Sequence, residues 1–243
     1  MEVIHDLLGY DGLKIIQSTD AFRFSLDSLL LADFVKVRVG IKRIIDIGCG
    51  NAPIPLFLTL KTNCPIMGVE IQEALANQAL RSVALNHCDE QITILAEDAR
   101  ILAKKEAYLH AFDIAIANPP YFPYTKSSHV NKKDALTIAR HEVHLTLQEL
   151  VAGAKDLLAD YGYFYLIHRT LRLEEIIDTL KQARFKTTRM RFIHSRKEDA
   201  AELVLIEAKK MGKSELVIEP PLVIYQEGSE YSPEVSSIFH FKK

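Results

Sequence analysis

The stretch Arg43-Ile44-Ile45-Asp46-Ile47-Gly48-Cys49-Gly50-Asn51-Ala52 carries the clearest structural signal in the chain. Its first half is short and rich in branched apolar side chains, which is typical of a buried strand. The apolar segment 54–60 follows the glycines and predicts a helix. A strand, a glycine turn and a helix in this order form the context of a dinucleotide-type fingerprint, because glycines let the backbone turn sharply and approach a ligand closely. Ala52 occupies the third glycine position of that pattern, where alanine is an accepted variant.

The acidic residue before the glycines departs from the pyrophosphate-binding pattern. A carboxylate at Asp46 suits a ligand with a positive charge, such as an amino group or a sulfonium. The next strand, 66–69, closes with Glu70, which lies roughly 20 residues past the glycines, where an acid commonly binds both ribose hydroxyls. A third strand, 92–95, leads to Asp98. This residue reads either as the cap of the next helix or as an acceptor for an exocyclic adenine amine.

A fourth strand, 112–117, ends in Asn118-Pro119-Pro120-Tyr121. The prolines have a fixed φ and no N–H, and they favour an extended backbone before them. The result is a stiff rim of carbonyl oxygens with the Asn118 amide and an aromatic ring, which suits a planar group carrying an NH2. The same residues also read as an ordinary strand-terminating turn. The polar residues at the other strand ends favour a functional site, because a short motif is significant only in the structural context that its function requires.

Regular alternation of strands and helices predicts an α/β, Rossmann-like sheet with helices on both faces. Parallel strands would bring Asp46, Glu70, Asp98 and Asn118 to one edge of the sheet. We assign residues 1–37 to an N-terminal extension, a hairpin plus a helix, and 38–243 to the core domain. The other predicted elements are strands 12–17, 21–24, 162–168, 185–194 and 201–208, and helices 26–37, 72–86, 145–158 and 172–183. Asp27 and Ser28 open the helix at 26–37, where capping is the favoured interpretation.

Composition limits the classes of function. Of 243 residues, 48% are hydrophobic and 26% are charged, as in ordinary soluble proteins. We expect no membrane span and no signal peptide. The three cysteines form an odd count without ligand spacing, so we expect reduced thiols in a cytoplasmic protein and no metal site. The net charge is -2, so a nucleic-acid partner would need a local basic patch, for which 126–140 and 184–197 are the candidates, with an ordinary solvated face as the alternative.

These motifs resemble those of class I S-adenosylmethionine-dependent methyltransferases that act on amino groups. The resemblance rests on Asp46 to Gly50, Glu70, Asp98-Ala99 and the tetrapeptide from Asn118 to Tyr121. More closely, the chain is similar to the small bacterial tRNA adenine-N6 methyltransferases that modify valine tRNA beside the anticodon. The segments 24–31 and 231–234 carry that closer similarity.

The resemblance implies a seven-stranded sheet with an antiparallel last strand. It also implies S-adenosylmethionine as cofactor, S-adenosylhomocysteine as product and tRNA as substrate. The implied cofactor-binding residues are Asp46, Gly48, Cys49, Gly50, Glu70, Ile71, Asp98, Ala99 and Asn118. The implied catalytic residues are Asn118, Pro119 and Tyr121, and the substrate-binding residues are these three with Pro120. The basic segment 126–140 adds Lys132 and Lys133 as expected substrate-binding residues. A ribosomal RNA guanine-N2 methyltransferase, a protein glutamine-N5 methyltransferase and a catalytically silent RNA-binding module remain alternatives.

Overall fold

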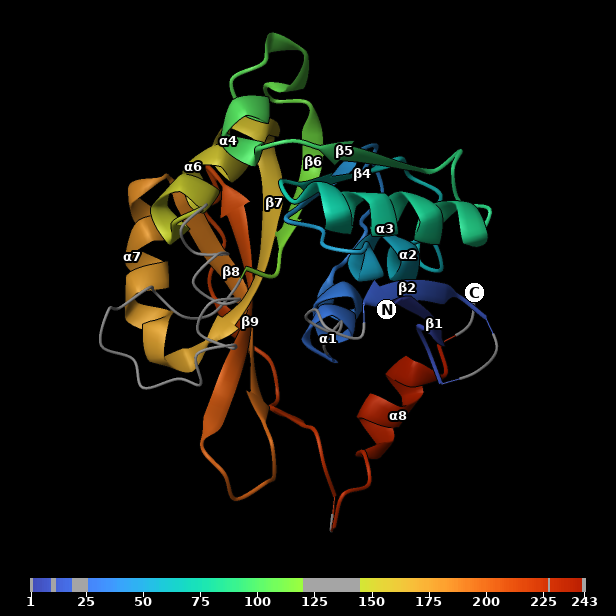
Figure 1. Ribbon diagram of the computed structural model, residues 1–243. Coiled ribbons are helices and arrows are strands. Elements are labelled where there is room, and N and C mark those ends of the chain that lie inside the picture. The colour runs from blue at the N-terminus through green and yellow to red at the C-terminus, as the bar shows by residue number, and fades with distance from the viewer. Residues whose placement is uncertain (1, 10–11, 19–25, 120–144, 227, 242–243) are drawn as a thin grey trace, which may run out of the picture.

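The computed structural model describes residues 2–9, 12–18, 26–119, 145–226 and 228–241. A twisted sheet runs through the centre of the molecule, with helices packed against it (Figure 1). The α-helices of the described residues are α1 (Leu26–Phe34), α2 (Pro53–Leu58), α3 (Glu73–Leu85), α4 (Ala99–Leu102), α6 (Leu147–Leu157), α7 (Leu173–Gln182) and α8 (Pro233–Phe239). Two short 3-10 helices, η1 (Glu106–Tyr108) and η2 (Thr170–Arg172), accompany them. No helix within these ranges is long and apolar enough to cross a membrane.

The main sheet contains nine strands among the described residues. In spatial order they are β10 (Val217–Ile218), β8 (Phe185–His194), β9 (Ala201–Lys210), β7 (Leu158–Arg169), β6 (Phe112–Ala117), β3 (Ile44–Ile47), β4 (Ile66–Glu70) and β5 (Ile92–Ala96), and β11 (Leu222–Val223) also pairs with β8. β9 is antiparallel to both β7 and β8, whereas the other pairs are parallel. The implied arrangement of seven strands with an antiparallel last strand is therefore confirmed, and the two-residue strands β10 and β11 raise the count to nine.

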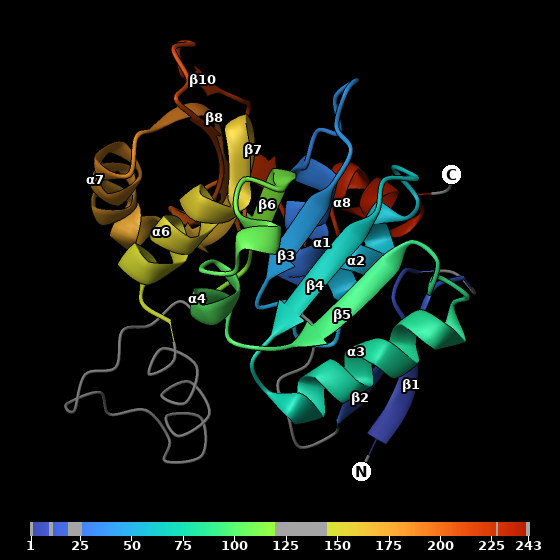
Figure 2. The same cartoon turned by 90° about the horizontal axis from the view of Figure 1, so that it is seen from above.

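The two faces of the sheet are covered by different helices. In the view from above, α4, α6 and α7 lie on one side of the strands and α1, α2, α3 and α8 on the other (Figure 2). Successive side chains of β6 point to opposite faces of the sheet. Ile114 and Ile116 belong to the hydrophobic cluster that includes α1, α2 and α3. Ala115 and Ala117 belong to the cluster that includes α6 and α7. A strand covered on both faces has no polar side, which explains the apolar run 114–117 that follows the partly buried Asp113.

The described residues give the N-terminal strand a partner that the sequence pattern does not predict. β2 (Lys14–Ser18) pairs in antiparallel fashion with β1 (Glu2–Asp6), whereas the sequence pattern predicts a partner at 21–24, which lies outside the described residues. Most of β1 is exposed, so it lacks the apolar alternation that would reveal a strand. β2 is tied to α3 by a hydrogen bond of 3.0 Å from the Ile16 N–H to Ser82 Oγ. The domain boundary at residue 37 stays a prediction.

A buried ion cluster joins α1, β7, β8 and β9. The Glu207 carboxylate lies 3.0 Å from Arg189 Nη2 and 2.9 Å from Arg38 Nη2, and it also accepts a hydrogen bond from the Tyr165 hydroxyl. Burial by itself would raise the pKa of Glu207, but the hydrogen bond from Arg38 and the charge of Arg189 hold it below its usual range. The guanidinium of Arg189 also sits 3.7 Å from the ring centre of Phe34.

We expect Glu207→Gln to lower the free energy of unfolding by up to about 3–5 kcal/mol, because the buried Arg189 guanidinium keeps only Glu219 as a counter-charge and Arg38 loses its carboxylate partner. Glu202→Gln is the matched control, because Glu202 pairs with Arg169 at 3.3 Å with a side chain that is 56% exposed. Its loss should stay below about 1 kcal/mol. Urea unfolding of both variants measures the difference, and equal losses would contradict the central role given to this cluster.

Candidate functional site

Four parallel, adjacent strands bring the predicted polar residues to one edge of the sheet. β3 lies between β4 and β6, and β5 lies beyond β4. In the register of β3 and β6, Asp46 stands opposite Ile116. Asn118 therefore follows two residues beyond that point, or about 7 Å further along the strand direction. The carboxyl edge of an open α/β sheet is where ligands bind in such folds.

The turn after β3 depends on residues in left-handed backbone conformations. Gly48 and Gly50 have φ values of 76° and 56°, and Ala52, which precedes α2, has a φ of 72°. Nothing lies within 4 Å of a Cβ built at either glycine, so backbone conformation, not space, is what these positions require. The side chain of Asn51 anchors the turn by donating to the Ile16 carbonyl of β2 at 2.8 Å.

Cys49 lies inside this turn as a buried thiol. Burial raises the pKa of Cys49 well above its usual value, and the nearby charges of Asp46 and Glu70 act in the same direction. A thiol with a raised pKa stays protonated and is a poor nucleophile. Cys49 is therefore suited to shaping the turn and not to covalent chemistry.

Asp46 is the least satisfied polar residue of the site. It is 1% exposed, and neither carboxyl oxygen has a hydrogen-bond partner among the described residues. Burial, with a smaller contribution from the charge of Glu70, raises the pKa of Asp46 to about 8. A buried carboxyl group without a partner is destabilising, and such groups concentrate at functional sites. A ligand with a positive charge or N–H groups would supply the missing partner.

Glu70, at the end of β4, is held by two backbone groups. Its carboxylate accepts from the Gly50 N–H at 3.0 Å and from the Gln72 N–H at 2.9 Å. These bonds join the ends of β3 and β4 and fix the direction of the carboxylate. A carboxylate has about four acceptor sites, so capacity remains for the two hydroxyls of a ribose. Ile71 follows it with its side chain partly in solvent, at 40% exposure.

Asp98 performs the capping role that the sequence offered as one of its two interpretations. It precedes Ala99, the first residue of α4, and its carboxylate accepts from the Arg100 N–H at 2.8 Å. The Arg100 side chain also reaches this carboxylate, at 2.6 Å, and bridges to Glu149 at 3.3 Å. A role of Asp98 toward an adenine amine stays a prediction.

Asn118 and Pro119 follow β6 directly, whereas Pro120, Tyr121, Lys132 and Lys133 lie outside the described residues. The Asn118 Nδ2 donates a hydrogen bond of 3.0 Å to Ser28 Oγ in α1. The sequence pattern interprets Ser28 as a helix cap and so misses this contact. The only sequence signal for it is the similarity of segment 24–31 to the tRNA methyltransferases. Within the described residues, no group of three His, Cys, Asp or Glu side chains could hold a metal ion.

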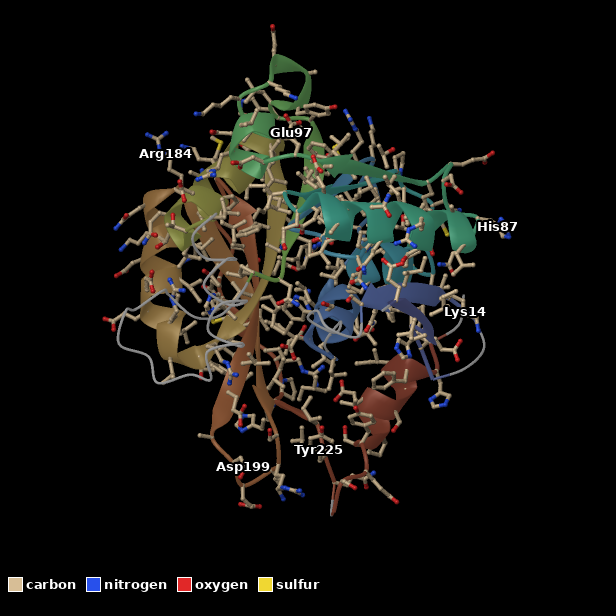
Figure 3. All side chains as sticks on the ribbon, viewed as in Figure 1. Lys14, His87, Glu97, Arg184, Asp199 and Tyr225 are labelled. Atoms are coloured by element: carbon tan, nitrogen blue, oxygen red, sulfur yellow. The ribbon has the colours of Figure 1, made fainter. Side chains whose placement is uncertain are left out.

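The basic stretch 184–197 does not form one surface patch. Arg184 precedes β8 and Asp199 follows it, and Figure 3 labels them at opposite ends of the molecule. Arg189, midway along the strand, is only 6% exposed and belongs to the Glu207 cluster, and Arg191 pairs with Glu234 at 2.8 Å. A ten-residue strand spans about 33 Å, which separates the cations at its ends. The interpretation of the stretch as a single RNA-binding surface is therefore wrong.

Comparison with known proteins identifies the family. A family model described as "Methyltransferase small domain" matches residues 23–193. The chain belongs to this family. One similar protein, named tRNA1(Val) (adenine(37)-N6)-methyltransferase, from Bacteroides thetaiotaomicron, is 30% identical over 165 residues, which cover 67% of this chain and 65% of that protein. A protein of the same name from Tolumonas auensis is 27% identical, over 93% of this chain and 91% of its own length.

Coverage of these relatives varies. The chain matches only 57% of the length of a third protein of that name, from Yersinia enterocolitica, at 30% identity. Among solved structures, a predicted O-methyltransferase from Agrobacterium tumefaciens matches with a TM-score of 0.68 at 22% identity, covering 88% of this chain and 95% of that one. At 22% identity, this similarity shows that the two proteins share a fold.

The raised pKa of Asp46 makes a prediction about stability. Because the folded-state pKa of about 8 lies above the ordinary value of 3.8, the folded protein without a ligand keeps a proton that the unfolded chain releases. The stability that Asp46 contributes is therefore complete below about pH 4 and is lost as the pH rises toward 8. Asp46→Asn should be more stable than wild type, and its advantage should grow by about 1.4 kcal/mol per pH unit across that window.

Urea unfolding of both proteins between pH 4 and 8 measures this difference. Asp199→Asn, at an exposed position in the turn after β8, is the control and should show no such growth. A pH profile of Asp46→Asn parallel to that of wild type would contradict the proposed ionisation.

Proposed function

We propose that this protein transfers a methyl group from S-adenosylmethionine to the exocyclic N6 amine of an adenine in the anticodon loop of a tRNA. The observation that carries the proposal is the placement of the buried, unpartnered carboxyl group of Asp46 beside the strand that ends in Asn118-Pro119. Asp46 suits a cationic cofactor, and Asn118 with Pro119 suits a planar amine. The names of the relatives support the tRNA adenine as the acceptor.

The edge of β3 and β4 has the groups that this cofactor needs. S-adenosylmethionine, when bound, supplies a methyl group activated by a sulfonium charge. Asp46 would accept from its positively charged part, and Glu70 would accept from its ribose hydroxyls. The left-handed turn at Gly48 and Gly50 lets the backbone come close to a ligand. The remaining proposed cofactor contacts are Cys49, Ile71, Asp98, Ala99 and Asn118.

The acceptor side of the site rests on Asn118 and Pro119. The lone pair of an adenine N6 amine is delocalised into the ring, so the nitrogen is a weak nucleophile. Hydrogen bonds from its two N–H groups to the Asn118 side chain and the Pro119 carbonyl would favour a pyramidal nitrogen whose lone pair is available. Positioning this nitrogen in line with the methyl group would supply much of the remaining acceleration. As the nitrogen takes the methyl group, the bond between that carbon and the cofactor's sulfur would break to leave S-adenosylhomocysteine, and the nitrogen would then release one of its N–H protons to water.

An adenine within a folded tRNA must leave its stack to reach such a site. Tyr121 and Pro120 would hold the base, and Lys132 and Lys133 would contact the RNA backbone; all four are proposed from sequence alone. At the carboxyl edge, Arg196 and Lys197 lie in the turn between β8 and β9, which projects from the body of the molecule near Asp199 in Figure 3. Because β8 runs parallel to β7 and β6, this turn emerges at the same edge as Asn118.

We expect Asp46→Ala and Glu70→Ala each to weaken S-adenosylmethionine binding by roughly 1.5–3 kcal/mol, because each removes a charge-assisted hydrogen bond. Isothermal titration calorimetry measures this change, with circular dichroism to verify that the variants are folded. Glu90→Ala, which removes an exposed carboxylate from the same half of the chain, is the control. Unchanged affinity in both folded variants would refute the cofactor site, and a preference for NAD would indicate a dehydrogenase-like site.

The substrate is tested by incubating the protein with cofactor labelled in its methyl group and with total tRNA, ribosomal RNA and release factors. We expect label in N6-methyladenosine when nucleosides from the tRNA are analysed by mass spectrometry. Label only in N2-methylguanosine or only in a release-factor glutamine would replace the proposal with one of these activities. Binding of RNA without transfer to any of the three acceptors would instead favour an RNA-binding module.

A further inference from the structure

Ser28 reaches the predicted reaction site from a distant part of the chain. Its Oγ accepts a hydrogen bond of 3.0 Å from Asn118 Nδ2, although 90 residues separate the two in sequence. Ser28 is 6% exposed, so water competes little for this bond. A helix cap would need only the backbone N–H groups of its own first turn. The contact with Asn118 therefore requires another explanation.

The explanation lies in the two unlike ends of an asparagine amide. Nδ2 is a donor and Oδ1 an acceptor, and a half-turn about the terminal bond exchanges their places. An amine that donates its N–H groups can be received by Oδ1 but is repelled by Nδ2. A serine hydroxyl can donate or accept, and in this structure Ser28 accepts from Nδ2, so the donor end of Asn118 lies toward α1 and the acceptor end lies away from this contact. A site that depends on a hydrogen bond of fixed polarity gains from such a support.

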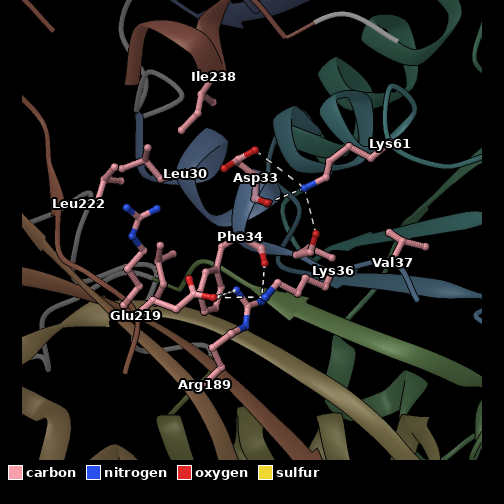
Figure 4. Close-up of a pocket in the computed structure, with 13 residues that line it drawn as sticks. Leu30, Asp33, Phe34, Lys36, Val37, Lys61, Arg189, Glu219, Leu222 and Ile238 are labelled. Atoms are coloured by element: carbon pink, nitrogen blue, oxygen red, sulfur yellow. Dashed lines mark hydrogen bonds and ion pairs between the residues drawn. The ribbon is translucent and has the colours of Figure 1, made fainter. Parts of the chain in front are cut away.

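The helix that carries Ser28 is fixed at its other end. Lys61 Nζ donates to the carbonyl oxygens of Ala32 at 3.1 Å and Val35 at 2.9 Å, and Arg189 Nη2 donates to that of Phe34 at 2.6 Å. Figure 4 shows both cations converging on the end of α1, beside a cavity of about 410 Å³. These bonds satisfy carbonyl groups that a helix leaves without internal partners. The helix predicted over 26–37 ends at Phe34, where these bonds are made.

The sides of α1 are also enclosed by protein. Leu29, Leu31 and Ala32 are 0% exposed, and the ring of Phe34 packs edge-on against Tyr165 of β7 with ring centres 6.1 Å apart. A helix whose apolar side chains are buried this fully is held by the core around it. The Ser28 hydroxyl thus has a fixed position from which to orient a neighbouring side chain.

We infer that Ser28 is a positioning residue for methyl transfer: it holds the Asn118 amide in the orientation that presents Oδ1 to the substrate amine. The inference rests on the proposed function, because it assumes that Asn118 receives the reacting amine. It assigns Ser28 no contact with cofactor or substrate. Its effect should therefore appear in turnover, and only while Asn118 is present.

The test uses the full-length chain and four variants: Ser28→Ala, Ser28→Thr, Asn118→Ala and the double variant Ser28→Ala/Asn118→Ala. Loss of one hydrogen bond in Ser28→Ala should lower kcat about 2- to 10-fold. Ser28→Thr keeps the hydroxyl and should restore kcat toward the wild-type value. The dissociation constant of S-adenosylmethionine and the KM for tRNA should change by less than about twofold in both Ser28 variants.

The double variant separates positioning from a general structural role. If Ser28 acts through Asn118, adding Ser28→Ala to Asn118→Ala should cause no further fall in kcat. In NMR spectra, the side-chain amide protons of Asn118 should exchange faster with solvent in Ser28→Ala than in wild type. An unchanged kcat in Ser28→Ala, or an equal fall in both backgrounds, would overturn the inference.

Failure of the proposed function would look different. If wild-type protein methylates a guanine amine or a glutamine amide, the tRNA adenine assignment fails, and the same four variants are compared on the true acceptor, where the same kcat pattern is expected. If wild-type protein transfers no methyl group to tRNA, ribosomal RNA or release factors, both the proposed function and the inference about Ser28 are overturned.

Discussion

The parallel direction of six of the seven core strands is the constraint on which the site depends. Asp46, Glu70, Asp98 and Asn118 come from four separate strand ends, and only a shared direction places them at the same edge. β9 is the antiparallel exception, and it lies two places away from β6, beyond β7. The edge that carries the polar residues is thus formed without interruption from β5 to β7. Because helices cover both faces of the sheet, these strands consist mainly of apolar residues, and the polar residues of the site lie at the strand ends.

Asp46 occupies a position that is unfavourable for the stability of the fold. Its carboxyl group is buried where no described residue bonds to it, and its pKa is raised to about 8 by burial and by Glu70. A core optimised only for stability would place a neutral side chain here. Glu70, one strand away, is in contrast held by two backbone N–H groups. The site therefore combines one carboxylate held by the protein with one carboxyl group that has no partner among the described residues.

The buried cations of the molecule support the fold more than they attract a substrate. Lys61 and Arg189 bond the carbonyls at the end of α1, and Arg189 also neutralises Glu207. The Arg189 contact connects β8 to the helix that carries Ser28, and the Lys61 contact connects that helix to the segment after α2. The C-terminal third thus acts on the site from a distance, because it holds in place the helix that touches Asn118.

Local sequence determined much of this protein. The buried strands, the glycine turn and the residues at the strand ends follow from apolar runs and from glycine and proline chemistry, which act over a few neighbouring residues. Tertiary structure alone decided which distant groups meet. The sequence pattern assigns Ser28 to a helix cap and Arg189 to a basic stretch, but a hydrogen bond of 3.0 Å links Ser28 to Asn118, and Arg189 is buried against Glu207. It also misses the pairing of β1 with β2, because β1 is an exposed strand without apolar alternation. Such contacts join residues far apart in the chain, and no local pattern records them, because their energy exists only after the sheet and its helices have come together.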